Sequence, residues 1–535
     1  MPPPTKRSSF GIAAFAALNV LAGVDAQNVT TYAPISVTCP SGSFLRHAGT
    51  PQSNDQALHP DEATYVNSRK QLVQSALVNW LGDKASTVYG GNLASLSADQ
   101  LPNLAISLSG GNFRAALFNA AALHAFDSRN STSVSKGLGG LLQASTYMSA
   151  LSGGSYTLTS LMFNEFPTLP DLVFGNNATG VSGWQLEQSL LSPGPSGAYS
   201  QAFFGHLYED LGAKRAAGNF PVTFCDLWGR ALAYHFFPGT STPDAFTLNT
   251  TAGNHAAGLA YSSAVNLNTW KNHTMPFPIF IANVNSPNGK GTPFGSPNNL
   301  PLSNVVYEIT PLEFGSYEPE LASFIPMQYL GSTLQAGTPT SCVNSFDNVG
   351  LMIGTSSCDF HIFNITNDPA WVSPQGFAPL LSQITTLFGA YQPGQALDVA
   401  SVPNPFLGVN VGVYQDANET ALSLLDGSMD VENDPILPLL VKKRGVDVIV
   451  VLDSSGETSE LKPDGLSLLA TREKAALLPP GTINFPTPFP NTTAQFVSLG
   501  LNARPVFFGC DGAPNANDAF PYALSHNHAK IWFSF

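Results

Sequence analysis

The chain has 535 residues, of which 43% are hydrophobic and only 11% are charged, so a large core is available and the surface must be mostly uncharged. The formal net charge of −14 argues against nucleic acid as a partner and against electrostatic docking on an anionic membrane. Zwitterionic and neutral substrates are not excluded. No Cys/His cluster has metal-ligand spacing, so the sequence predicts no structural zinc.

The first 26 residues are typical of a secretory signal peptide. Lys6 and Arg7 precede an apolar run from Phe10 to Ala22, and a small residue ends the segment. This run is too short for a membrane span, and the alternative is a buried N-terminal helix. We therefore expect a signal peptide over residues 1–26, a single domain over residues 27–535, and secretion of the mature protein.

Glycosylation sequons support export. The motif Asn-x-Ser/Thr predicts surface positions in a secreted chain. It occurs at Asn28, Asn130, Asn177, Asn249, Asn272, Asn364, Asn418 and Asn491. So many sequons behind a signal peptide suggest a glycoprotein.

Five cysteines also bear on the compartment, because disulfides form in oxidising surroundings. They are Cys39, Cys225, Cys342, Cys358 and Cys510. The odd number leaves at least one thiol free or paired between chains. Cys342 and Cys358 are closest in sequence, and the spacing favours this pair.

The first half of the chain alternates apolar runs with helical stretches. In order, the sequence predicts an extended arm over 27–60, a helix over Asp61–Leu81, a strand over Ala105–Leu108, a helix over Arg114–Phe126, a polar loop over Ser128–Gly140, a helix that begins at Ser152, a helix over Phe224–Phe237, a buried strand over Phe277–Val284 and a loop over Asn285–Pro301.

The second half continues the alternation. It predicts β or loop segments over Tyr307–Phe314 and Val343–Ile353, a helix over Leu380–Ala390, a strand over Ala421–Leu425, a helix over Pro435–Lys443 and a strand over Val446–Leu452. The last run, VDVIVVL, is apolar on both faces, which is typical of a strand in a parallel sheet. Strands that alternate with helices favour an α/β fold.

Ser152 lies in a turn suited to a nucleophile. The stretch LLQASTYMSALSGGSYTLTSLM places this serine between a β-prone run and a helical one, so its hydroxyl would sit at the tip of a sharp turn. The common G-x-S-x-G pattern is not met, because position 150 is Ala although Gly154 is in place. The alternative is an ordinary glycine-rich turn.

A second glycine turn precedes it. The run AISLSGGNFRAAL leads from a strand through Gly110, Gly111 and Asn112 into a helix, whose first amides could bind an oxyanion. Arg114 at the start of that helix could bind a phosphate or a carboxylate. Each feature also has a non-catalytic interpretation: the glycines could form an ordinary tight turn, and Arg114 could be a surface cation.

The acid that would partner Ser152 is ambiguous from the residues alone. Asp426 ends an apolar strand and precedes a glycine, as expected at the carboxyl end of a sheet. Asp453 after VDVIVVL is a similar candidate. A Ser-Asp-His triad would need His526 or His528, whereas a Ser–Asp dyad needs no histidine.

The chain resembles the secreted fungal lysophospholipases, also called phospholipases B, whose catalytic domain is shared with patatin-like Ser–Asp phospholipases. The resemblance extends over nearly the whole mature chain. It is carried by YAPISVTCP, SGGNFRAA, GLLQASTYMSALSGGSY, FCDLWGRALAYHF, ITPLEFGSYEP, SFDNVGLMIGTSS, VPNPFLG, LLDGSMDVENDPILPLL, VDVIVVLDSS and PVFFGCD.

The resemblance implies a role for each candidate. Ser152 matches the nucleophile, and Asp426 matches the dyad aspartate in preference to Asp453. Gly111 and Asn112 match the oxyanion amides, and Arg114 matches the arginine that assists with the phosphate. The implied fold is a three-layer α/β/α domain around a central, mainly parallel sheet, and the chemistry needs no metal or other cofactor.

Departures from the family pattern surround the site. The third glycine of the glycine turn is Asn112, the glycine two residues before the serine is Ala150, the tryptophan after GGS is Tyr156, and the second glycine after the aspartate is Ser428. Asn tolerates positive φ better than most residues and still offers its backbone N–H. The chain also lacks the long apolar C-terminal tail of a lipid-anchor signal.

These observations predict a secreted, glycosylated serine hydrolase of fatty acyl esters in lysophospholipids and diacyl phospholipids. Its partners would be lipid aggregates or membrane surfaces, without a transmembrane span, and the cell wall is a further possible location. Two alternatives remain. One is a lipid-binding homologue that has lost turnover, and the other is a Ser-His-Asp carboxylesterase or peptidase.

Overall fold

A computed structural model describes most of the chain. The described ranges are 31–50, 55–82, 93–190, 193–194, 197–237, 255–360, 398–480, 482–483, 485–486, 489–509 and 530–534. The expected signal peptide, the helix expected over Leu380–Ala390, Cys510, His526 and His528 lie outside them. Within these ranges no helix is both long and apolar enough to cross a membrane.

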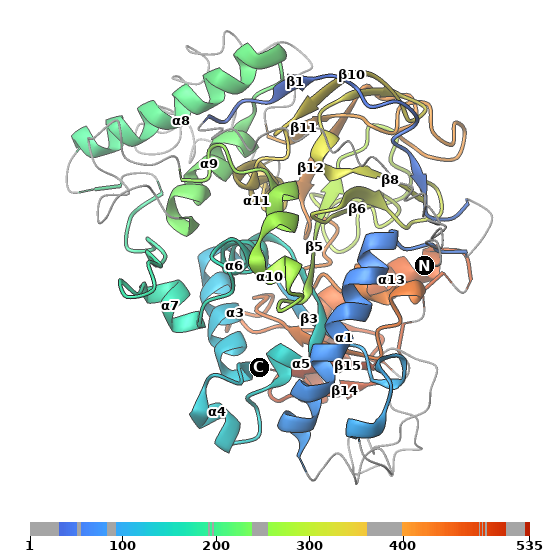
Figure 1. Ribbon diagram of the computed structural model, residues 1–535. Helices are drawn as coiled ribbons and strands as arrows, with labels where there is room; N and C mark the ends of the chain where they lie inside the picture. Colours follow the sequence, from blue (N-terminus) through green and yellow to red (C-terminus); the bar gives the residue numbers. More distant parts are fainter. Residues whose placement is uncertain are drawn as a thin grey trace, which may run out of the picture.

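Five parallel strands form the centre of a mixed sheet (Figure 1). In spatial order they are β15 (Lys530–Ser534), β13 (Val448–Leu452), β3 (Leu104–Leu108), β4 (Ser145–Ala150) and β5 (Phe277–Val284). β13 pairs in parallel on both sides, with β15 and β3, as its apolar sequence predicted. Helices cover both faces, so the three-layer α/β/α fold is confirmed.

Antiparallel strands extend this centre on both sides. They are β14 (Phe507–Phe508), β6 (Val306–Ile309), β7 (Glu313–Ser316), β8 (Ser323–Pro326), β2 (Arg46–His47), β11 (Ala400–Pro403) and β12 (Ala421–Asp426). β14 pairs with β15 at one edge, and β6, β7, β8 and β2 follow β5. β12 pairs with both β5 and β11. A separate small sheet contains β1 (Ile35–Val37), β10 (Thr338–Asn344) and β9 (Thr333–Gln335).

The described helices are α1 (Pro60–Leu81), α3 (Asn112–Phe126), α4 (Ser131–Ser135), α5 (Leu141–Ala144), α6 (Ser152–Phe163), α7 (Leu169–Phe174), α8 (Gly197–Gly218), α9 (Phe224–Phe236), α10 (Asn268–Lys271), α11 (Val349–Thr355), α13 (Leu466–Leu477) and α14 (Thr493–Ser498). Short connections lead from β3 into α3 and from β4 into α6, whereas α7 to α10 follow one another without a strand between them. α3 and α6 lie on one face of the sheet, and α1 and α13 lie on the other (Figure 1). The segment expected to be helical over Pro435–Lys443 forms short 3-10 turns, Leu437–Leu440 and Lys442–Arg444.

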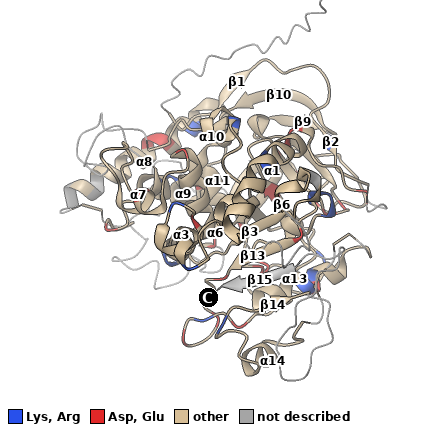
Figure 2. Cartoon of the chain, turned by 60° about the horizontal axis from the view of Figure 1, so that its bottom comes forward, with Lys and Arg blue, Asp and Glu red and all other residues tan. Residues whose placement is uncertain are grey.

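Buried ion pairs use several of the chain's few charges. Figure 2 shows how sparse charged residues are along the chain. The fully buried guanidinium of Arg444 bonds Glu62 on α1 at 2.8 Å and Glu308 on β6 at 2.7 Å. A buried charge needs such partners because desolvation otherwise makes it costly. These pairs tie α1 to the antiparallel side of the sheet.

One segment differs from its expected structure. The β or loop structure expected over Val343–Ile353 is correct only for its start, because α11 begins at Val349. The side chain of Asn348 accepts a hydrogen bond from the Gly350 N–H at 2.8 Å and caps the helix. Gly350 then lies against Gly229 of α9, where an added Cβ on Gly229 would be 2.1 Å from the Gly350 carbonyl oxygen. The glycines of α11 and α9 thus allow the two helices to pack in close contact.

The disulfide pairing differs from the one favoured by sequence spacing. Cys39 is bonded to Cys342, and Cys225 is bonded to Cys358, so the Cys342–Cys358 pair is wrong. Spacing failed because the fold brings together cysteines that are 303 and 133 residues apart, respectively.

Candidate active site

Ser152 is the first residue of α6, directly after β4. Its φ is +46°, a left-handed conformation that is unusual for serine and typical of a strained, sharply turned nucleophile. Only 7% of the residue is exposed. The turn therefore presents one hydroxyl at the carboxyl edge of the parallel strands, as the sequence predicted.

Two glycines after the serine permit this turn. An added Cβ on Gly153 would lie 2.2 Å from the Asn112 carbonyl oxygen, and one on Gly154 would lie 2.3 Å from the Leu108 carbonyl oxygen. Neither contact is possible for a real side chain. The SGGS sequence thus lets α6 start directly against the end of β3 and the start of α3.

The glycine turn after β3 touches the Ser152 turn. An added Cβ on Gly110 would lie 3.0 Å from the Ser152 Cβ. The Gly110 N–H donates to the Asn433 carbonyl oxygen at 3.2 Å, so this amide is occupied. Gly111 has φ +131° and Asn112 has φ +55°, so Asn112 takes the positive φ that a glycine would adopt there.

The next two amides lie at the start of α3. The first N–H groups of a helix lack intrahelical acceptors. Among the described residues, no hydrogen bond uses the N–H of Gly111 or Asn112, and both residues are exposed. Two amide donors beside Ser152 are thus available for an oxyanion, with the positive end of the α3 dipole behind them.

Asp426 reaches Ser152 from the opposite direction. It ends β12, which runs antiparallel to β5 and places Asp426 beside Ala282. The expectation that Asp426 ends a strand is right, but the parallel-sheet reason for it is wrong. The Ser152 hydroxyl lies close enough to the Asp426 carboxylate to favour its ionised form and so lower its pKa. Ser152 and Asp426 therefore meet between strands of opposite direction.

Burial makes Asp426 a stronger base than an ordinary carboxylate. Desolvation, with a smaller contribution from the negative charge of Asp359, raises the pKa of Asp426 to about 7. Hydrogen bonds from Ser428 and Ser152 lower this pKa in part, and the Ser428 N–H and hydroxyl both reach Asp426 at 2.8 Å. A carboxylate with this pKa is suited to proton transfer near neutral pH.

Asp453 lies in a different environment. Its carboxylate accepts hydrogen bonds from the N–H and hydroxyl of Ser455, and burial raises its pKa. Its charge also interacts with Arg114, whose guanidinium lies near both Gly111 and Gly456: added Cβ atoms there would be 3.3 and 3.2 Å from Nη2. The structure thus brings Asp426 to Ser152, and Asp453 to Arg114.

Arg114 is exposed on the first turn of α3, next to the free amides. Its cation could therefore meet an anionic group of a substrate whose ester lies at Ser152. No histidine within the described ranges forms a hydrogen bond with Ser152 or Asp426. The triad candidates His526 and His528 lie outside those ranges.

The segment after α11 contributes contacts that the sequence did not predict. The Ser152 N–H donates to the Ser356 carbonyl oxygen at 2.9 Å and to its hydroxyl at 3.2 Å. The same carbonyl accepts from the Gly427 N–H at 3.4 Å. These contacts join segments far apart in the chain, so spacing along the sequence does not reveal them. The sequence signal nearest to them is Asn348, the residue that caps the start of α11.

Comparison with known proteins identifies the family. The lysophospholipase catalytic domain matches residues 104–521, which include Ser152 and Asp426. The chain belongs to the lysophospholipase family. Lysophospholipase 3 of Candida albicans is 33% identical over 96% of this chain, and the probable lysophospholipase 5 of Schizosaccharomyces pombe is 35% identical over 90%.

The chain is shorter than these relatives. It spans 64% of the Candida albicans protein and 72% of the Schizosaccharomyces pombe protein. Among solved structures, human GIVD cytosolic phospholipase A2 has a similar fold, with a TM-score of 0.59 over 93% of this chain and 57% of that chain. The identity of 17% makes this a likeness of fold.

Proposed function

We propose that the protein hydrolyses the fatty acyl ester of lysophospholipids, and of diacyl phospholipids, through an acyl-enzyme on Ser152. The placement of the Ser152 hydroxyl beside the buried Asp426 carboxylate carries this proposal: the hydroxyl acts on the pKa of Asp426, and both backbones are bonded to the segment after α11. It makes a base available to the nucleophile without a histidine. The lysophospholipase family of the chain and the two free amides beside Ser152 support the same chemistry.

In the first half-reaction Asp426 accepts the Ser152 proton while Oγ attacks the ester carbonyl carbon. The N–H groups of Gly111 and Asn112 stabilise the oxyanion of the tetrahedral intermediate. Its collapse breaks the bond to the glycerol oxygen, which receives the proton from Asp426. Water then attacks the acyl-enzyme, Asp426 accepts its proton, and that proton returns to Ser152 as the fatty acid leaves.

We assign binding of the lipid head group to the exposed cation of Arg114. Its side chain would bind the phosphate oxygens of the lipid, because a guanidinium forms paired hydrogen bonds with phosphate. We propose that the substrate is drawn from lipid aggregates or membrane surfaces. Turnover should then rise steeply when lysophosphatidylcholine is assayed above the concentration at which it forms micelles.

We also propose that the protein is secreted and glycosylated after removal of residues 1–26, leaving one catalytic domain over 27–535. Two disulfides support an oxidising compartment. Exposed sequon positions are Asn177, Asn272, Asn418 and Asn491, whereas Asn130 is half-buried and caps α4. Asn28, Asn249 and Asn364 lie outside the described ranges. Glycosidase treatment followed by mass spectrometry of the exported protein tests both parts.

A serine-directed fluorophosphonate probe tests the function itself. Wild-type protein should be labelled at Ser152 and should release fatty acid from lysophosphatidylcholine, whereas Ser152→Ala should do neither while its circular dichroism stays unchanged. Hydrolysis retained by Ser152→Ala would refute the assignment. Lysolipid binding by an unlabelled wild-type protein would instead favour the lipid-binding homologue.

The carboxylesterase alternative has its own test. A Ser-His-Asp mechanism would require a histidine after Asp426 in the chain, and the candidates are His526 and His528. Replacing both with alanine should leave the labelling rate of Ser152 unchanged if the dyad acts alone. A large loss of labelling would favour the triad.

A further inference from the structure

A short segment after α11 holds the backbones of both dyad residues. We call Ser356–Asp359 the bridging segment. The Ser356 carbonyl oxygen accepts the Ser152 N–H at 2.9 Å, and the Cys358 carbonyl oxygen accepts the Asp426 N–H at 3.0 Å. Three consecutive residues thus set the positions of a nucleophile and a base that are far apart in sequence.

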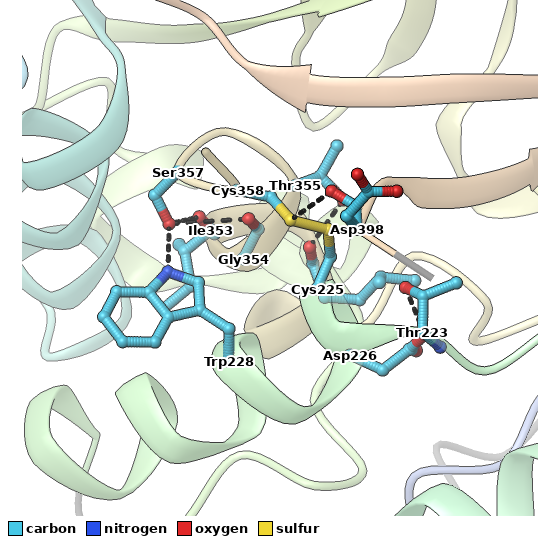
Figure 3. The surroundings of a disulfide bond; sticks show 11 residues. Thr223, Cys225, Asp226, Trp228, Ile353, Gly354, Thr355, Ser357, Cys358 and Asp398 are labelled. Carbon is cyan, nitrogen blue, oxygen red and sulfur yellow. Dashed lines mark hydrogen bonds between the residues drawn. A yellow bond between two sulfur atoms is a disulfide. The ribbon is translucent and has the colours of Figure 1, made fainter. Parts of the chain in front are cut away.

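The bridging segment is itself anchored to its surroundings. Figure 3 shows Cys358 bonded to Cys225 of α9, and the Trp228 indole N–H donating to the Ser357 hydroxyl at 2.9 Å. The Ser356 hydroxyl donates to the Ile281 carbonyl oxygen on β5 at 2.7 Å. α9 and the sheet therefore hold this segment from two sides.

Asp359 ends the segment with a carboxylate that the proposed mechanism does not use. It is half-buried and directly follows the residue that accepts the Asp426 amide. Its negative charge acts on Asp426 and also on the buried phenol of Tyr156. Burial raises the pKa of Asp359 to about 6. The backbone hydrogen bond between Cys358 and Asp426 thus holds Asp359 one residue away from the contact with Asp426.

We propose that Asp359 is a positioning residue of the dyad, which acts on Ser152 only through the neighbouring Asp426 carboxylate and is held in place by the Cys225–Cys358 disulfide. The inference rests on the proposed function, because it needs Asp426 to be the base. Asp359 itself does not touch the substrate or the nucleophile. Its contribution is electrostatic, and it sets the pH range over which the base is available.

The other described groups around Asp426 are neutral, so the electrostatic effect on Asp426 is attributed to Asp359. Ser152 of α6 and Ser428 of the following turn face it as neutral hydrogen-bond donors. The Tyr156 phenol of α6 is also neutral at physiological pH, because burial raises its pKa. Asp359 is the charged neighbour that acts on Asp426 among the described residues. Its ionised form disfavours the Asp426 carboxylate by like-charge repulsion.

The direction of the effect follows from this repulsion. The base form of Asp426 is needed for attack, so the rate should rise as the pH increases through the Asp426 pKa of about 7. Asp359→Asn removes the repelling charge and should lower that pKa. The acid limb of the rate profile should then move to lower pH by about one unit.

The test measures the rate of Ser152 labelling by a fluorophosphonate from pH 4 to 9, because labelling needs neither a lipid surface nor head-group binding. Asp359→Asn should shift the acid limb to lower pH with a similar plateau, and Asp359→Glu should restore the wild-type limb. A plateau reduced at every pH, with the limb unmoved, would overturn the proposal and indicate a merely structural role. An unchanged profile would also overturn it.

The proposed role of the Cys225–Cys358 disulfide is tested against a matched control. Cys225→Ser with Cys358→Ser should shift the acid limb in the same direction, and adding Asp359→Asn should shift it no further, since both changes remove one interaction. Cys39→Ser with Cys342→Ser breaks the disulfide that joins the residue two positions after β1 to β10, and should leave the limb unchanged. An additive shift in the triple variant would contradict the disulfide's role.

These outcomes are separate from a failure of the proposed function. If wild-type Ser152 is not labelled at any pH, the proposed function fails first. If wild-type protein is labelled and loses labelling in Asp426→Asn, the function stands, and only the profiles of the Asp359 variants decide the further inference.

Discussion

The two halves of the active site are built in different ways. The turns after β3 and β4 come from the parallel centre, where a strand, a glycine turn and a helix follow one another within a few residues. Asp426 comes from the antiparallel extension, and its place depends on β5, β12 and the segment after α11. The nucleophile half is thus defined locally, whereas the acid half depends on contacts between distant segments.

This difference decides how each half responds to change. A local turn is disturbed mainly by side chains added to its own residues, because the backbones already touch. An acid that is placed by long-range pairing is sensitive to loss of its charge and to the segments that hold it. The four predictions below test this contrast, and the largest expected effect comes first.

The acid half should show the largest effect. Asp426→Asn removes the base without changing its size and should lower kcat by about 10²- to 10⁴-fold. The matched variant Asp453→Asn should lower it far less, because Asp453 bonds Ser455 rather than Ser152. Steady-state hydrolysis of lysophosphatidylcholine measures both. Equal losses of kcat in the two variants would contradict the assignment of Asp426, rather than Asp453, as the base.

The nucleophile half should be sensitive to a single added methyl group. In Gly110→Ala the Cβ would lie 2.5 Å from Leu151 Cδ1 and 3.0 Å from Ser152 Cβ. Relief of this contact would move Ser152, and a shift of about 1 Å can cost on the order of 10² in rate. Gly205→Ala is the control, because an added Cβ there meets nothing within 4 Å and Gly205, like Gly110, is not a glycine of positive φ. A Gly110→Ala variant with the wild-type labelling rate would show that the turn is not tightly packed.

The head-group cation should affect binding more than chemistry. Arg114→Ala should reduce kcat/KM for lysophospholipids by about 10- to 100-fold, as expected for hydrogen bonds to a charged group of roughly 1.5–3 kcal/mol. An uncharged monoacylglycerol should show little change, since it has no phosphate. A loss of the same size on both substrates would mean that Arg114 supports the adjacent amides instead.

The smallest effect should follow from the departure at Asn112. Asn112→Gly removes a side chain from a residue at φ +55° but also deletes its hydrogen bond from the Phe113 N–H at 2.8 Å. The free energy of unfolding should change by less than about 1 kcal/mol, because relief of strain and added chain entropy offset each other. Denaturant titration and kcat measure this, and a large gain in kcat would show that the asparagine impairs the oxyanion site.

Much of the nucleophile half could be predicted from the sequence. The apolar runs before Gly110 and Ser152 gave the ends of β3 and β4, and their glycines gave the turns. The direction of β12 could not be predicted, because an apolar run shows burial but not pairing. The choice of Asp426 over Asp453 came from resemblance to a family, and it stays a prediction that the variants of the two acids test.

Other contacts were hidden for the same physical reason. The Cys225–Cys358 disulfide and the bonds between Ser356 and Ser152 join segments separated by more than 100 residues. Periodicity and spacing report on neighbours along the chain, so they carry no information about such pairs. The start of α11 was missed because its glycines serve helix contact rather than a turn.

The Cys39–Cys342 disulfide has a consequence for biosynthesis. Its two cysteines are separated by 303 residues, so the first cysteine of the chain must wait, as a thiol, until more than half of the protein has been made. Closing so long a loop reduces the entropy of the unfolded chain and can add on the order of 5 kcal/mol of stability. The arm that carries Cys39 is therefore synthesised long before the disulfide that fixes it can form.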